Sequence, residues 1–291
     1  MQLAILIPTY NYNALALVRA LSELIDHEKV DAEIVVGDDA STQDMSWMYE
    51  AEMLPHVRLW STAVNLGRAH ILNALAKSAR AEWLLIMDAD AVPTDTFSLL
   101  YYLEAGKQAP VVCGGLWHPD VNPNPKATLR YKYERRADRH RSAAERNLHP
   151  YTQLSTFNLL VRRDVFMDIQ FDAQCTDYGY EDALFGVELK ECGITLLHID
   201  NQLIHMGLEP NAVYLHKAET ALRTLRSLDG RMHGNSHVEN VANSLRRWHI
   251  AWVFQGLHLL FGWAARLNLR SRYPSLTIFS LYKLGYYLSL K

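Results

Sequence analysis

Through its first ninety residues the chain alternates short apolar runs with segments in which apolar side chains recur at helical spacing. The apolar runs lie at 3–7, 33–37, 57–60 and 83–87 and have the length of β-strands. Between them, large apolar residues recur every three or four positions at 17–25, 45–53 and 71–75. Repeated strand–helix units form right-handed crossovers, and these build parallel sheets. The sequence therefore predicts an α/β fold with a Rossmann-like, mainly parallel sheet flanked by helices.

A polar cluster follows each of the four predicted strands. These clusters are Pro8-Thr9-Tyr10-Asn11, Asp38-Asp39-Ala40-Ser41, Asn65-Leu66-Gly67-Arg68 and Asp88-Ala89-Asp90. In open parallel sheets, ligands bind at the carboxyl ends of the strands, where helix N-termini point N–H groups at bound anions. The chain has neither Gly-x-Gly-x-x-Gly nor a Walker A lysine, which argues against a dinucleotide-dependent oxidoreductase or a P-loop enzyme.

Two of these clusters contain paired carboxylates. Asp88 and Asp90 follow a buried apolar run, so they would repel each other at the sheet edge unless a cation neutralised them. The alternative is a solvated turn before Pro93. Asp39 could accept the ring N–H of a pyrimidine base while Asp38 caps the following segment. A capping role for both is the alternative.

Taken in order, five motifs resemble those of the family 2 glycosyltransferases of GT-A fold. They are Ile7-Pro8-Thr9-Tyr10-Asn11, the segment 33–41, Asn65-Leu66-Gly67 with Asn73 after it, Met87-Asp88-Ala89-Asp90 and Gly179-Tyr180-Glu181-Asp182, and the match covers about 3–215. The resemblance implies a GT-A-like domain, a nucleotide-sugar donor, a divalent cation at the Asp-x-Asp motif and an inverting transfer to a hydroxyl acceptor.

The resemblance also implies roles for individual residues. The nucleotide would contact Pro8, Thr9, Tyr10, Asn11, Asp39, Asn65, Gly67, Arg68 and Asp88. The metal would be held by Asp90, Asp88 and His205, although a lone histidine in apolar surroundings is more often structural. The catalytic residues would be Asp182, as general base, and its neighbour Glu181; an acidic start to a helix is the alternative for this pair.

Two features leave specificity open. Where many relatives carry an arginine before the asparagine matched by Asn73, this chain has Leu72, so the base stays undetermined and Arg68 is the nearest cation. The basic stretch 126–146 is either a solvated helix or a flap that faces the acceptor or the diphosphate.

The charge is distributed unevenly along the chain. The whole sequence has 29 Lys and Arg against 32 Asp and Glu, so nucleic acid is not an expected partner. Residues 217–291 instead hold eleven basic residues against three acidic ones. We therefore expect a GT-A-like domain over 1–216 and a basic, aromatic-rich helical extension over 217–291.

Within the extension, 248–265 is free of charged residues, but His249, Gln255 and His258 would be costly inside a bilayer. This segment either packs on the catalytic domain or makes peripheral membrane contact through 246–291.

The cellular compartment is predicted from the cysteines and the start of the chain. Cys113, Cys175 and Cys192 lack metal-ligand spacing and are expected to be small core residues, and no secretory signal precedes the first strand. The prediction is a cytoplasmic protein, with the inner face of the membrane as an alternative location.

The sequence as a whole favours an inverting, metal-dependent glycosyltransferase of polysaccharide biosynthesis. A UDP-sugar is the preferred donor, Mn²⁺ or Mg²⁺ the cofactor, and a glycan or lipid-linked hydroxyl the acceptor. The alternatives are a sugar-1-phosphate nucleotidyltransferase and a non-catalytic member of the fold that binds sugars or partners.

Overall fold

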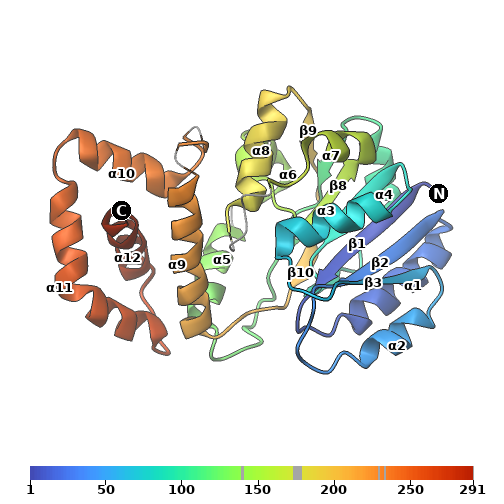
Figure 1. Cartoon of the computed structure of the whole chain (residues 1–291), viewed down its shortest axis with the longest axis horizontal. Helices are drawn as coiled ribbons and strands as arrows, with labels where there is room; N and C mark the ends of the chain where they lie inside the picture. The colour runs from blue at the N-terminus through green and yellow to red at the C-terminus, as the bar shows by residue number, and fades with distance from the viewer. Residues whose placement is uncertain (139–140, 173–178, 229, 233, 291) are drawn as a thin grey trace.

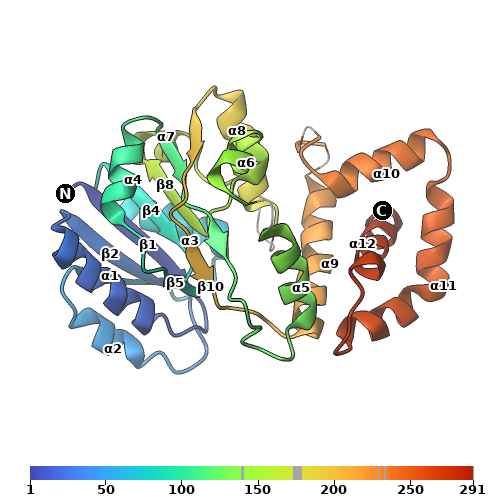
Figure 2. The same cartoon turned by 180° about the vertical axis from the view of Figure 1, so that it is seen from behind.

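The computed structural model describes residues 1–138, 141–172, 179–228, 230–232 and 234–290. An α/β part built on a central sheet lies beside a helical part formed by the C-terminal helices (Figure 1). Seen from behind, the same two parts are arranged with α5 and α9 between the sheet and the outer helices (Figure 2).

The central sheet has seven strands in the order β3-β2-β1-β4-β8-β6-β9. They are β1 (Leu3–Thr9), β2 (Ala32–Asp38), β3 (Val57–Ser61), β4 (Trp83–Met87), β6 (Val111–Cys113), β8 (Asn158–Arg162) and β9 (Leu196–His198). Strands β1 to β4 are parallel, β6 is parallel to β9, and only β8 runs antiparallel to its neighbours. The predicted mainly parallel sheet is confirmed.

Both faces of this sheet are buried, which explains why the strand sequences are almost continuously apolar. In β1, Leu3, Ile5 and Ile7 join one core cluster and Ala4 and Leu6 join the other, because successive side chains point to opposite faces. Three helices contribute to the first cluster: α1 (Leu15–Glu28), α2 (Trp47–Glu52) and α4 (Leu99–Gly106). The second cluster receives side chains from α3 (Arg68–Ser78), α7 (Arg163–Ile169) and α8 (Glu181–Glu191). It also receives them from the C-terminal helices α9 (Asn211–Ser227), α10 (His237–Arg247) and α12 (Leu276–Ser289).

A small second sheet brings distant residues together at the edge of the first. It has the order β5-β10-β7, with β5 (Ala91–Pro93), β10 (Leu203–His205) and β7 (Leu116–Trp117). His205 pairs with Ala91 in this ladder, next to Asp90. The sheet therefore places a histidine beside the Asp-x-Asp motif although 115 residues separate them in the chain.

The basic stretch 126–146 forms α5 (Thr128–Asp138) and most of α6 (Ala143–Asn147). Residues 139 and 140, between these helices, lie outside the described part of the chain. A short 3₁₀ helix, η1 (Pro150–Gln153), follows α6.

Of the three cysteines, Cys113 is buried as predicted and Cys175 lies outside the described residues. The prediction is wrong for Cys192, which is exposed because it follows the surface end of α8.

The C-terminal extension is helical, as predicted. It comprises α9 (Asn211–Ser227), α10 (His237–Arg247), α11 (Ala251–Arg270) and α12 (Leu276–Ser289), and α12 contacts the other three. The boundary expected at residue 216 falls inside α9, and the division into two domains stays a prediction. None of the helices in the described part of the chain combines the length and apolar character needed to cross a lipid bilayer.

Candidate active site

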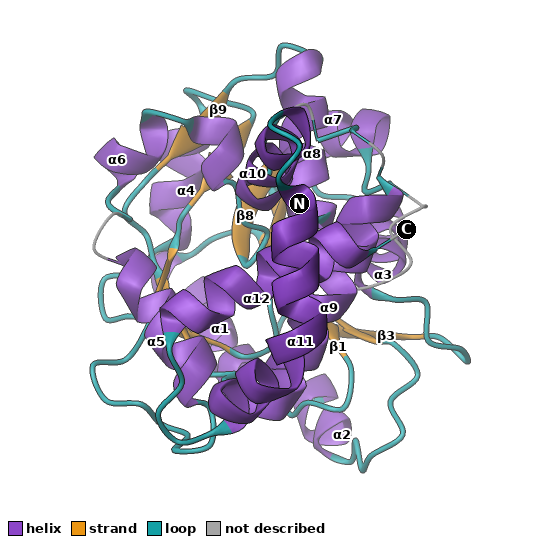
Figure 3. Ribbon diagram, turned by 90° about the vertical axis from the view of Figure 1, so that its left-hand side faces the viewer, coloured by secondary structure: helices purple, strands orange, loops and turns teal. Residues whose placement is uncertain are grey.

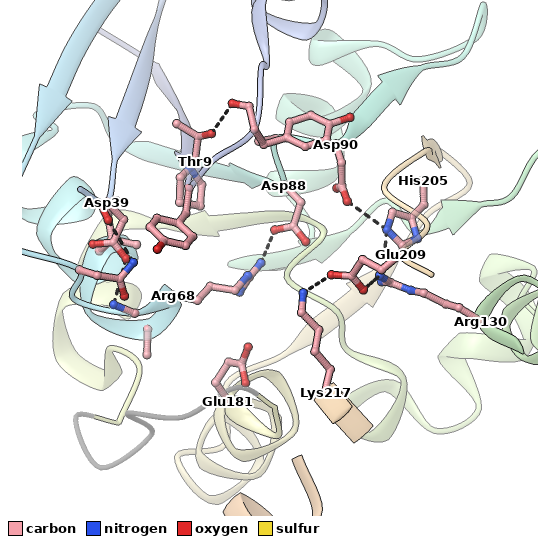
Figure 4. Close-up of a pocket in the computed structure, with 18 residues that line it drawn as sticks. Thr9, Asp39, Arg68, Asp88, Asp90, Arg130, Glu181, His205, Glu209 and Lys217 are labelled. Atoms are coloured by element: carbon pink, nitrogen blue, oxygen red, sulfur yellow. Dashed lines mark hydrogen bonds and ion pairs between the residues drawn. The ribbon is translucent and has the colours of Figure 1, made fainter. Parts of the chain in front are cut away.

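The polar clusters that follow β1, β2, β3 and β4 converge on one pocket of about 510 Å³ (Figure 4). Most of the residues singled out from the sequence line it, namely Pro8, Thr9, Tyr10, Asp39, Asn65, Gly67, Arg68, Asp88, Asp90, Glu181 and His205. The pocket forms where it does because parallel strands end at the same edge of the sheet. We call it the donor-side pocket, after the nucleotide-sugar donor that the resemblance implies.

Asp39 connects two of the loops at this edge. Its carboxylate oxygens accept hydrogen bonds from the backbone N–H groups of Leu66, at 2.7 Å, and Gly67, at 2.9 Å. Asn65 donates in return to the backbone carbonyl of Asp39, at 3.0 Å. Gly67 has a φ of 81°, a conformation that glycine adopts without a steric penalty. The loop before α3 is therefore fixed against the end of β2.

Asn11 lies outside the lining of the pocket and holds the first loop instead. Its side-chain oxygen accepts from the N–H groups of Thr42, at 2.8 Å, and Gln43, at 3.0 Å. Its own N–H donates to the Ser41 hydroxyl at 2.7 Å. In this structure Asn11 joins the loops after β1 and β2, so any effect it has on a bound nucleotide acts through those loops.

The two aspartates of the Asp-x-Asp motif have different partners. Asp88 forms an ion pair with Arg68. Asp90 Oδ2 lies 3.2 Å from His205 Nε2, while Asp90 Oδ1 is buried and has no hydrogen-bond partner among the described residues. Burial raises the pKa of Asp90, but the hydrogen bond and charge of His205 outweigh it, so the net shift is downward. Asp90 thus presents an ionised oxygen with an unused coordination position.

A buried polar network supports His205 from its other side. His205 Nδ1 lies 3.2 Å from Glu134 Oε2, and His118 Nε2 lies 2.5 Å from the same oxygen. His118 Nδ1 contacts Asp138 at 3.0 Å, and Arg130 donates to Glu134 Oε1 at 2.8 Å. Burial would lower the pKa of His205, but its hydrogen bonds to Asp90 and Glu134 prevail and raise it to about 9.

This network is also a second place where a cation could bind. Of the described His, Cys, Asp and Glu side chains, His118, Glu134 and His205 form the group whose ligand atoms all lie within 4.8 Å of one another. Sequence reasoning missed His118 and Glu134. The i, i+4 spacing of Glu134 and Asp138, which puts both carboxylates on one face of α5, was the available signal.

Glu181 and Asp182 open α8 on the far side of the donor-side pocket. Asp182 accepts from the Thr156 hydroxyl at 2.5 Å and from the Thr156 N–H at 3.0 Å, and it lies 3.5 Å from Arg68. Glu181 Oε2 is buried without a hydrogen-bond partner among the described residues. Burial and the charge of Asp182 raise the pKa of Glu181.

A second pocket of about 350 Å³ lies against the same pair of acids. We call it the acceptor-side pocket, after the hydroxyl acceptor that the resemblance implies. Asp182 lines this pocket and not the donor-side pocket, whereas Glu181 lines both. Aromatic side chains from α5, α9 and α12 form part of its wall, together with a lysine; they are Tyr133, Tyr214, Phe279 and Lys283.

Several residues of the donor-side pocket were not singled out from the sequence. They are Tyr12, Arg130, Glu209 and Lys217. Lys217 and Arg130 both pair with Glu209, and Arg130 comes from the basic stretch that was expected to be either a solvated helix or a flap. Because Arg130 faces the pocket, at least this part of the stretch contributes to the site (Figure 4).

Comparison with known proteins gives a family match and a set of similar folds. The family model described as glycosyl transferase family 2 matches residues 4–170. No curated protein matches the sequence.

Three similar solved structures illustrate the fold. The mannosyltransferase PcManGT from Pyrobaculum calidifontis, in complex with GDP-Man and Mn²⁺, has 18% identity and a TM-score of 0.58, over 99% of this chain and 84% of that one. S. aureus TarS 1-349 has 16% identity and a TM-score of 0.51, over 79% of this chain and 66% of that one. TarS 1-349 in complex with UDP has 17% identity and a TM-score of 0.53, over the same shares of the two chains. The chain thus spans slightly less than two thirds of TarS 1-349.

Proposed function

The chain belongs to glycosyl transferase family 2, and from this premise we propose that it transfers a sugar, with inversion, from a UDP-sugar to a hydroxyl of a glycan or lipid-linked acceptor. The observation that carries the proposal is the meeting of two pockets at one pair of acids, Glu181 and Asp182. One pocket holds the donor and the other the acceptor. Family membership argues against the sugar-1-phosphate nucleotidyltransferase alternative.

The donor binds in the pocket lined by Asp39, Asn65 and Arg68. Asp39 is held at the end of β2 with its oxygens near the base site, and Arg68, Arg130 and Lys217 supply positive charge for the diphosphate. Each of these cations pairs with a carboxylate in the structure, so diphosphate oxygens would compete for groups that are already in position. A nucleotide in this class of fold has precedent in the UDP complex of TarS 1-349 and the GDP-Man complex of PcManGT.

The residues around the Asp-x-Asp motif fit a divalent cation. The unpartnered, ionised Oδ1 of Asp90 is the strongest indication, and Asp88 and His205 lie beside it. Carboxylate oxygens suit Mg²⁺ or Mn²⁺, and a histidine ligand favours Mn²⁺, the ion present with PcManGT. When bound, the cation would offset the negative charge that builds on the leaving diphosphate.

Asp182 acts as the general base. It lines the acceptor-side pocket, and Thr156 fixes both of its oxygens. As the acceptor oxygen bonds to the anomeric carbon, the bond from that carbon to the diphosphate breaks and the hydroxyl proton passes to Asp182. Attack from the side opposite the leaving group inverts the anomeric centre. Glu181, which borders both pockets, positions the sugar between them.

Calorimetry with UDP, in Mn²⁺ and in EDTA, tests the cation site. The diphosphate and two nearby aspartates repel each other, so we expect Mn²⁺ to tighten UDP binding by at least about tenfold. Asp90→Ala should lose this gain. Asp95→Ala, which removes an exposed acid close by in the chain, should keep it. Equal affinity in EDTA, or an Asp90→Ala variant that behaves as wild type, would exclude a cation at the motif.

A further variant locates the ion. If Glu134→Gln loses the Mn²⁺ effect while Asp90→Ala keeps it, the ion binds at the His118, Glu134 and His205 group instead. A donor-hydrolysis screen across nucleotide sugars then identifies the base and the sugar. Donor binding without hydrolysis or transfer to any acceptor would favour the non-catalytic alternative.

A further inference from the structure

Helix α11 lies at the edge of the molecule farthest from the central sheet (Figure 1), and many of its large apolar side chains are exposed. Trp252 is 69% exposed, Leu259 84% and Trp263 67%. The same outer face also carries Val253, Leu257, Leu260, Phe261 and Leu267, all of them exposed. A helix at the surface of a globular protein normally turns polar side chains outward, and contiguous apolar patches of this kind mark interaction sites.

The inner face of α11 packs against α12 and α9. Gly285 of α12 lets the two helices approach so closely that an added Cβ would lie 2.7 Å from His258 Cβ. Arg266 pairs with Glu219 of α9 at 3.0 Å and donates to the Tyr282 hydroxyl. The helix is therefore anchored by one face, and its outer face lies toward the viewer when the molecule is seen from that side (Figure 3).

The charge around this face has a single sign. After Glu239 the sequence contains no Asp or Glu, but it contains five arginines and two lysines. Arg247 lies just before α11, and Arg270 and Arg272 lie at its end. These three side chains are exposed and have no carboxylate partner within ion-pair distance among the described residues. The apolar face is thus flanked at both ends by unpaired positive charge.

We propose that α11 docks flat on an anionic lipid surface, with its tryptophans and leucines in the interface and the flanking arginines among the headgroups. Helices that lie in the membrane plane combine Trp, Phe and Leu on one face with basic residues at the border, which is the arrangement seen here. A second copy of the chain fits this face poorly, because it would bring two surfaces that lack acids together.

Docking through α11 also bears on the acceptor. Helix α12 packs on α11 with one face and supplies Phe279 and Lys283 to the acceptor-side pocket with another. The pocket is then one helix layer from the lipid, which favours the lipid-linked acceptor over a soluble glycan. This last step alone rests on the proposed function; the docking itself does not.

Co-sedimentation of the full chain with vesicles tests the proposal. We expect binding to phosphatidylcholine vesicles that contain 30% phosphatidylglycerol, weaker binding to pure phosphatidylcholine, and release as NaCl rises from about 0.1 M to about 1 M, where the Debye length falls to about 3 Å. Trp263→Glu should lower the partition constant by at least about tenfold, because one buried aromatic side chain is worth that much. Arg270→Gln and Arg272→Gln should each lower it about fivefold.

The matched control is a substitution that also replaces an exposed apolar side chain with glutamate, but at a site far from α11. Met53 is 86% exposed beside α2, on the opposite side of the sheet part, and Met53→Glu should bind vesicles as wild type does. Circular dichroism checks that both glutamate variants fold. Full-length protein that stays in the supernatant with anionic vesicles at low salt would overturn the proposal. So would equal binding by Trp263→Glu, or a concentration-dependent dimer that Trp263→Glu abolishes in a chain that does not bind vesicles.

Discussion

Replacing Asp182 with asparagine removes a proton acceptor and nearly preserves the shape of the side chain. Asp182 makes two contacts with Thr156, one with its hydroxyl at 2.5 Å and one with its N–H at 3.0 Å. Asparagine can keep both, because its carbonyl oxygen accepts from the N–H and its amide donates to the hydroxyl oxygen. Arg68 still has Asp88 as an ion-pair partner. We expect the free energy of unfolding to change by less than about 1 kcal/mol.

The effect on catalysis should be far larger. A positioned general base contributes about 10² to 10⁴ in rate, which corresponds to about 3 to 5 kcal/mol of transition-state stabilisation. Asp182 does not line the donor-side pocket, so the affinity for UDP in Mn²⁺ should stay within about twofold of wild type. Transfer to acceptor, UDP affinity and melting temperature, measured on one preparation, separate these effects.

Glu181→Gln is the matched comparison. Glu181 Oε2 has no hydrogen-bond partner among the described residues, and burial raises the pKa of this carboxyl, so a neutral glutamine resembles its protonated form. Transfer should fall by less than about tenfold, and stability should be unchanged or slightly higher. Near wild-type transfer by a folded Asp182→Asn variant would refute the assignment, and a large loss in Glu181→Gln would move the base to Glu181.

Two further predictions concern stability. Burial lowers the pKa of His198 to about 4, and its Nδ1 lies 2.8 Å from Arg146, so this histidine is neutral in the folded protein. The unfolded chain binds a proton at this residue below about pH 6.5, so the free energy of unfolding should fall by about 1.4 kcal/mol per pH unit from there toward about pH 4. Urea unfolding at pH 7 and pH 4.5 should show that the free energy of unfolding decreases less in His198→Gln than in wild type. Equal decreases in the two proteins would contradict this. Gly285→Ala should destabilise the protein by about 1 kcal/mol or more, because the new Cβ would clash with His258, although alanine has the better helix propensity. Gly256→Ala should not destabilise it, because a Cβ at that position meets no atom within 4 Å. Thermal melts of the two variants test the difference.

The sequence by itself determined the sheet and the order of its motifs. The runs predicted at 3–7, 33–37, 57–60 and 83–87 are β1 to β4 with ends moved by at most two residues. This succeeded because the pattern is local: a strand buried on both faces must be apolar along its length, and parallel strands must end at one edge. Asp39 and Asp90 therefore share a pocket for reasons visible in the sequence.

The supports of the site were decided by tertiary structure. His118 follows β7, Glu134 lies on α5 and His205 ends β10. Their contact depends on how β10 pairs with β5 and β7 and on where α5 packs. No sequence period encodes such a contact. The contacts of individual side chains were decided in the same way. Asn11 and Asp182 belong to the motifs found in the sequence, but they bond to Thr42 and Thr156 of neighbouring loops and do not line the donor-side pocket.

The apolar segment 248–265 separates the two kinds of information most clearly. Its sequence was compatible with packing on the domain and with lying on a membrane, because hydropathy measures only how much apolar surface a segment has. The fold decides how that surface is divided. Gly285 and His258 bring α12 against one face of α11, and no element among the described residues covers Trp252 and Trp263. Exposure is a property of the packed helices together, so only the tertiary structure could determine it.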